Sequence, residues 1–98
     1  WMIDVAKLLQ DLELGWSWRK QSADTNRNLR CMIARQALIE GILDLPDGQS
    51  KLESVYHILL LNILRIYPYT HDAETYDFLE SALRKTLNII SDLKEKAI

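Results

Sequence analysis

Apolar residues recur along the chain three and four residues apart, which is the spacing of α-helical faces. Over about residues 2–20, the apolar stripe consists of Val5, Leu8, Leu9, Leu12 and Trp16. Similar stripes predict helices over about residues 24–43, 51–67 and 72–96. Four helices joined by short connections pack antiparallel by default. The sequence therefore predicts an all-α fold, an antiparallel four-helix bundle, that forms a single domain over residues 1–98.

The boundary between the first two predicted helices is weakly marked. Gly15 is a point where the first helix can bend or stop early. Residues 21–26 are polar and rich in capping residues, which favours a turn with the second helix starting near Asp24. A helix that runs through this segment is the alternative. Gly41 predicts either close packing or early fraying of the second helix.

The last two predicted helices have clearer boundaries. Residues 44–49 contain a proline and an Asp–Gly pair, which predict a turn. Ser50 and Glu53 then fit the S-x-x-E pattern of a capping box at the start of the third helix. Thr70 or Asp72 is expected to cap the fourth helix.

The third predicted helix is apolar on nearly every side. Such a helix is either central in its bundle or buried against another chain. Because a 98-residue domain has a limited interior, some apolar side chains are expected to face a partner. The candidate partner-binding residues are Leu14, Trp16, Trp18, Ile58 and Leu61. This surplus favours a non-enzymatic protein-interaction module that binds an amphipathic helix or a second copy of itself.

Charge is unevenly distributed along a chain whose formal net charge is −2. Segment 16–36 holds a single acid, Asp24, against five bases. These bases are Arg19, Lys20, Arg27, Arg30 and Arg35. Together with Trp16 and Trp18 they suggest a nucleic-acid-binding surface as an alternative function. The simpler interpretation is a solvated helix face that pairs with the acidic start of the fourth helix.

The composition excludes several other classes of protein. The single cysteine, Cys31, excludes an internal disulfide and suits a reducing compartment, so a cytoplasmic location is expected. No apolar run approaches the roughly 18 residues of a membrane span. His57 and His71 have no neighbouring residues at metal-ligand spacing. The sequence therefore predicts no catalytic constellation, no metal site and no cofactor.

One pair of residues resembles a known motif. Arg65 and His71 are separated by five residues, which is similar to the R-x(4–6)-H motif of helical HEPN-type ribonucleases. The resemblance implies a ribonuclease in which the arginine stabilises phosphate and the histidine acts in acid–base chemistry. Ile66 stands where a polar residue often follows the arginine in that family.

The chain as a whole resembles the flagellin export chaperones over roughly residues 2–97. Asp4-Val5-Ala6 is similar to the Asp-Gly-Ala of their first core helix. Residues 43–48 are similar to their Leu-Asp-x-x-x-Gly loop, and Tyr56 lies where their Leu-Tyr-Asp-Tyr helix would be. The extended N-terminal segment of that family has no counterpart here. The resemblance implies a small cytoplasmic helical bundle that holds another protein before secretion, in the class of adaptors, chaperones and assembly components.

Overall fold

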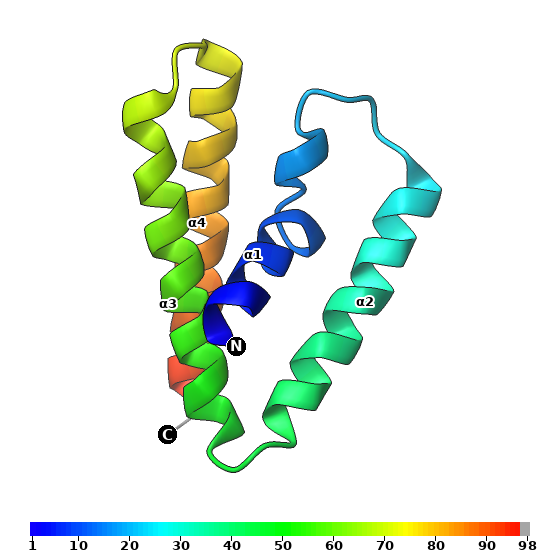
Figure 1. The fold of residues 1–98 in the computed structure, drawn as a ribbon, viewed down its shortest axis with the longest axis vertical. Coiled ribbons are helices and arrows are strands. Elements are labelled where there is room, and N and C mark those ends of the chain that lie inside the picture. The colour runs from blue at the N-terminus through cyan, green and yellow to red at the C-terminus, as the bar shows by residue number, and fades with distance from the viewer. Residues whose placement is uncertain (97–98) are drawn as a thin grey trace.

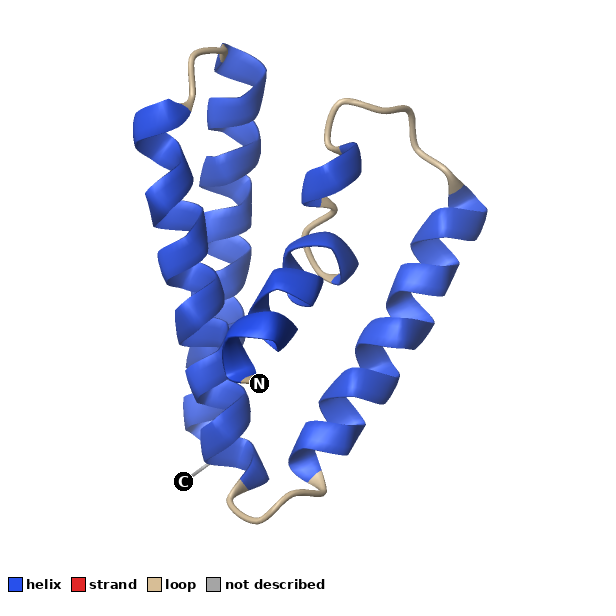
Figure 2. Ribbon diagram, in the orientation of Figure 1, coloured by secondary structure: helices blue, strands red, loops and turns tan. Residues whose placement is uncertain are grey.

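The computed structural model describes residues 1–96, which form four α-helices and two short 3-10 helices (Figure 1). In chain order these are α1 Met2–Leu12, η1 Trp16–Trp18, α2 Thr25–Leu43, α3 Gly48–Ile66, η2 Tyr67–Tyr69 and α4 Ala73–Lys96. Within these residues no strand is present (Figure 2). The prediction of an all-α fold, an antiparallel four-helix bundle, is confirmed.

The centre of the bundle is α3, which packs against α1, α2 and α4. It buries more side chains of the hydrophobic core than α1 or α2 does. The buried apolar residues of α3 are Leu52, Val55, Tyr56, Leu59 and Ile63. The central position, the first of the two alternatives that the sequence left open, therefore explains much of its apolar character, whereas Leu61 and Leu64 of α3 remain exposed.

The first helix is shorter than predicted, because it ends at Leu12 and not near residue 20. Gly15 adopts a left-handed conformation with φ 73°, which turns the chain out of the helix and into η1. A Cβ atom at Gly15 would lie 3.0 Å from Trp18 Nε1, so the missing side chain also makes room for the folded-back Trp18 ring. The chain from residue 19 to residue 24 is not helical, which confirms the turn before α2.

The third helix starts three residues earlier than predicted, at Gly48, and the capping box is wrong. Asp47 is its N-cap residue, in a left-handed conformation with φ 55° and without a side-chain capping bond. Ser50 lies inside the first turn, where its carbonyl accepts a hydrogen bond from the Ser54 hydroxyl. A Cβ atom at residue 48 would lie 2.5 Å from the carbonyl oxygens of Ile42 and Leu43. Because Gly48 lacks this atom, the third helix can begin here, directly against the end of α2.

Two other predicted caps are present. The Asp24 carboxylate accepts a hydrogen bond from the Arg27 amide at 3.1 Å at the start of α2. The Asp72 carboxylate accepts from both the amide and the hydroxyl of Thr75, at 2.9 and 2.7 Å, at the start of α4. These bonds hold the pKa of Asp72 below its usual value, and Lys20 lowers it further.

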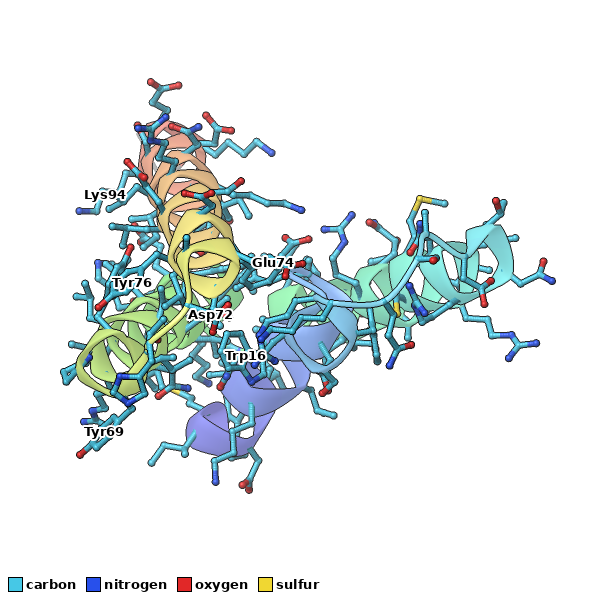
Figure 3. All side chains as sticks on the ribbon, turned by 90° about the horizontal axis from the view of Figure 1, so that it is seen from above. Trp16, Tyr69, Asp72, Glu74, Tyr76 and Lys94 are labelled. Carbon is cyan, nitrogen blue, oxygen red and sulfur yellow. The ribbon has the colours of Figure 1, made fainter. Side chains whose placement is uncertain are left out.

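The second helix is the least buried of the four. Ile42 is the one fully buried residue among its 19. Its exposed apolar side chains are Leu29, Met32, Ile33 and Leu43. α2 packs on α1 and α3, and it stands apart from α4 in both the side and the top views (Figures 1 and 3). Gly41 has open space around it, so close packing does not explain this glycine.

None of the helices within residues 1–96 has the combination of length and apolar character that a bilayer crossing needs.

Candidate functional site

An open groove lies between α2 and α4, which form its two walls, while the end of α1 and one side of α3 form its floor. Its upper half is a hollow of about 460 Å³ lined by apolar residues that include Leu14, Trp18, Met32 and Phe78. Its lower half is a hollow of about 310 Å³. The apolar residues of this lower half are Ile39, Leu43, Leu52, Ile89 and Leu93. Glu13 and Arg35 line both hollows, and their ion pair lies at the boundary between the two.

A buried carboxylate stands at the middle of the groove floor. The Glu13 side chain is only 7% exposed and is contacted by residues from the three other helices. Its Oε1 accepts a hydrogen bond from the Tyr56 hydroxyl at 3.1 Å, and its Oε2 lies 3.3 Å from Arg35 Nε. Lys85 Nζ donates to the Glu13 carbonyl at 2.9 Å and lies 3.9 Å from Oε2. These contacts compensate the cost of removing the carboxylate from water.

The phenol of Tyr56 is strongly affected by this environment. Burial raises the pKa of Tyr56 well above its ordinary value, and the neighbouring Glu13 carboxylate raises it further. Arg35 opposes this change. The phenol therefore stays protonated throughout the physiological range and acts as a hydrogen-bond donor to Glu13.

The upper end of the groove is closed by aromatic and cationic side chains. The rings of Trp16 and Phe78 pack with their centroids 5.8 Å apart. The Arg19 guanidinium lies 3.8 Å from the Trp16 ring centroid and donates to the Trp16 carbonyl at 3.0 Å. Arg27 lies 5.2 Å from the Trp18 ring centroid. Trp16 lies where α1 and α4 approach each other in the top view (Figure 3).

The structure brings together three of the five candidate partner-binding residues. Leu14 and Trp18 line the upper hollow, and Trp16 packs beside them on Phe78. The other two candidates, Ile58 and Leu61, lie on α3 about 160° and 140° around the helix from Tyr56, which faces the groove floor. Ile58 packs against the core, whereas Leu61 is 50% exposed. These two residues are therefore not part of the groove.

Most of the predicted basic patch contacts the chain itself. Arg19 and Arg27 stack on the tryptophans, Lys20 pairs with Asp72 at 3.4 Å, and Arg35 pairs with Glu13. Arg30 is exposed on α2. Four of the five basic residues therefore contact groups of the chain, and Arg30 is the one for which no such contact is found among residues 1–96.

Arg65 and His71, the pair that resembles the ribonuclease motif, both lie at the α3–α4 connection and are exposed. Within residues 1–96 neither side chain makes a hydrogen bond or an ion pair. In the same part of the chain, no group of three or more His, Cys, Asp or Glu side chains is placed to hold a metal ion.

The residues at the centre of the groove were not singled out from the sequence. Glu13 follows Leu9 by four residues and so falls on the apolar face of the first helix. Arg35 likewise lies four residues from both Cys31 and Ile39 on the inner side of the second helix. An acid on the apolar face of the first predicted helix and a base on the inner side of the second are the signal that could have predicted a buried ion pair.

Comparison of the chain with protein-family models, with curated proteins and with solved structures finds no match. The geometry of the groove is therefore the basis on which a function is proposed.

Proposed function

We propose that this protein is a non-enzymatic protein-interaction module that binds an amphipathic α-helix in the groove between α2 and α4. The observation that carries the proposal is the packing of α2, which has one fully buried residue among 19 and exposes a row of apolar side chains. A helix in a folded domain normally covers its apolar stripe. Met32 and Leu43 line the groove, so a helix docked between α2 and α4 would cover these two of the four exposed apolar residues, and Leu29 and Ile33 lie outside the groove lining.

Together, the two hollows extend over about three to four turns of a helix. Their apolar lining on α4 extends from Phe78 to Leu93, and that on α2 from Met32 to Leu43. At 1.5 Å per residue these walls are roughly 22 and 16 Å long. Binding an amphipathic helix in an apolar groove is a common recognition mode, in which side chains at i, i+3, i+4 and i+7 act as anchors.

The resemblance to the flagellin export chaperones supports the same kind of function, since such proteins hold another protein before its secretion. A chaperone of this class in the cytoplasm is consistent with the single half-buried thiol of Cys31. Protein binding is favoured over nucleic-acid binding, because four of the five basic residues in segment 16–36 already contact groups of the chain.

The proposal is tested with a synthetic amphipathic peptide of about 18 residues and two matched variants. Met32 lines the groove and is 53% exposed, while Leu61 lies on the other side of α3 and is 50% exposed. Met32→Gln is expected to weaken peptide binding about tenfold, because the apolar contact is lost. Leu61→Gln is expected to leave the affinity unchanged. Isothermal titration calorimetry gives both affinities.

Amide chemical-shift mapping places the bound peptide. Shifts that follow the groove side of α2 and α4 would support the proposal. Shifts along the outer side of α3, or a loss of binding in Leu61→Gln and not in Met32→Gln, would overturn it. Light scattering at the same concentrations reports whether a second copy of the chain occupies the groove in place of the peptide.

A further inference from the structure

The groove is basic, although the chain as a whole carries a formal net charge of −2. Two acidic side chains, Asp11 and Glu13, line it. Four basic side chains also line it, namely Arg19, Arg35, Lys85 and Lys96. The local charge of the groove is therefore opposite to that of the whole molecule.

Both acids of the groove contact groups of the chain. Asp11 Oδ1 accepts a hydrogen bond from the Ser17 amide at 2.9 Å. The Glu13 carboxylate is 7% exposed and is bound by Tyr56 and Arg35. The Glu13 carboxylate is therefore not free to contact a partner, whereas Asp11 Oδ2 can still accept a hydrogen bond.

Two ammonium groups on the α4 wall remain accessible. Lys85 is 54% exposed, and its Nζ donates one hydrogen bond, to the Glu13 carbonyl at 2.9 Å, which leaves two of its three N–H groups for a partner. Lys96 is exposed and has no ion pair or hydrogen bond among residues 1–96. The two lysines are separated by 11 residues, which is three helical turns or roughly 16 Å along α4. They therefore lie on the same edge of the groove.

We propose that the groove selects an amphipathic helix whose apolar stripe is flanked by acidic residues on the edge facing α4, where Lys85 and Lys96 pair with them. Complementary charge of this kind sets partner choice and orientation more than it sets affinity. Because acidic residues about three turns apart would meet both lysines, the charge pattern also fixes the register of the bound helix. This inference depends on the proposed function, and its test separates the two.

The test uses three peptides with one apolar stripe and with Glu, Gln or Lys at the flanking positions. The Glu peptide is expected to bind about fivefold more tightly than the Gln peptide in low salt, and the Lys peptide more weakly than either. The advantage is expected to shrink as salt is raised, because both lysines are exposed. Attraction to the net charge of the whole chain would give the reverse order, so this order identifies the groove as its source.

Charge reversal supplies the control. The double variant Lys85→Glu with Lys96→Glu is expected to lose the preference for the Glu peptide and to bind the Lys peptide more tightly. The matched variant Lys7→Glu with Lys94→Glu makes the same change of net charge at exposed positions outside the lining of the groove, and it is expected to keep the original order. The Lys94 side chain points away from α2 in Figure 3.

The outcomes separate the acidic partner from the helix-binding function. Equal binding of all three peptides in the groove would overturn the acidic partner and keep the helix-binding function. Preference for the Lys peptide in the unmodified chain would likewise overturn the acidic partner and keep the helix-binding function. Binding of no peptide, or binding outside the groove, would overturn both.

Discussion

Glu13 is the residue at which the four helices converge. It is the C-cap residue of α1, while the groups that contact it come from α2, α3 and α4. A buried carboxylate is tolerated only where partners replace its lost hydration. Each of these helices must therefore be close to its final position before Glu13 is fully satisfied, so the residue specifies how the helices pack as well as the floor of the groove.

Glu13→Ala is expected to lower the free energy of unfolding by about 1–3 kcal/mol, because the Tyr56 hydroxyl and the Arg35 guanidinium lose their acceptor. Urea denaturation followed by circular dichroism measures the loss. Glu95→Ala removes an exposed carboxylate near the end of α4 and is the control, with a change within about 0.5 kcal/mol. Equal stability of the two variants would show that the Glu13 contacts contribute nothing.

Tyr56 predicts a specific dependence of stability on pH. Since burial and Glu13 raise its pKa, the folded protein keeps the phenol proton to a higher pH than the unfolded chain does. Its contribution to stability is therefore complete below about pH 10 and is lost as the pH rises above that value. In urea titrations from pH 8 to pH 11, the stability difference between the native chain and Tyr56→Phe is expected to narrow above pH 10. A difference that stays constant over this range would contradict the assignment.

The residues whose roles could be predicted from the sequence contact groups close by in the chain, whereas those that were missed contact distant ones. Asp24 and Asp72 cap their helices through groups three residues away, so local pattern alone predicts them. The partners of Glu13 lie between 22 and 72 residues away in the chain. No local pattern reports such contacts, although a charge on an apolar face marks the position.

At the scale of the elements, glycines decide where helices start and end. Gly15 turns the chain out of α1, and Gly48 brings the start of α3 against the carbonyls that end α2. Apolar periodicity predicted the existence of all four helices, but it placed the end of the first and the start of the third incorrectly. Periodicity continues through Trp16, and the close backbone contact at Gly48 is visible only once the two helices are packed.

Gly48 and Gly41 form a matched pair for testing this point. Gly48→Ala is expected to destabilise the fold by at least about 2 kcal/mol, because the new Cβ would lie 2.5 Å from two backbone carbonyl oxygens. Gly41→Ala, with no atom within 4 Å of its Cβ, is expected to stabilise α2 by roughly 0.5–1 kcal/mol through helix propensity. Thermal denaturation of both variants measures the two effects. Similar shifts of the same sign would contradict the described turn.

At the scale of the whole molecule, the four helices contribute unequally to the hydrophobic core. The α3–α4 pair and α1 share the hydrophobic core, whereas α2 contributes only Ile42 to its buried part. Regions with few buried apolar contacts open at lower free energy than the core does. The groove is therefore bounded by one firmly held wall and one loosely held wall.

Hydrogen exchange is expected to show this difference. The amides of α2 between Met32 and Gly41 should exchange faster than those of α3 between Leu52 and Ile63, since α2 opens without disrupting the core. A peptide that fills the groove should slow exchange in α2 more than in α3. Mass spectrometry of exchanged peptic fragments measures both. Equal protection of the two helices in the free protein would contradict the unequal packing.

The tight turn at Gly48 has a mechanical consequence for the groove. The close contact of Gly48 with the carbonyls of Ile42 and Leu43 fixes one end of α2 at this turn, whereas its opposite end is held by exposed contacts such as that of Arg27 with Trp18. Rotation of α2 about the turn would therefore move this opposite end the most. A helix of 19 residues is about 28 Å long. A rotation of about 10° at the turn would move the tip near Thr25 by about 5 Å, close to one helical pitch. A small repacking around Ile42 and Leu43 would thus be amplified into a large change in the width of the upper, aromatic end of the groove.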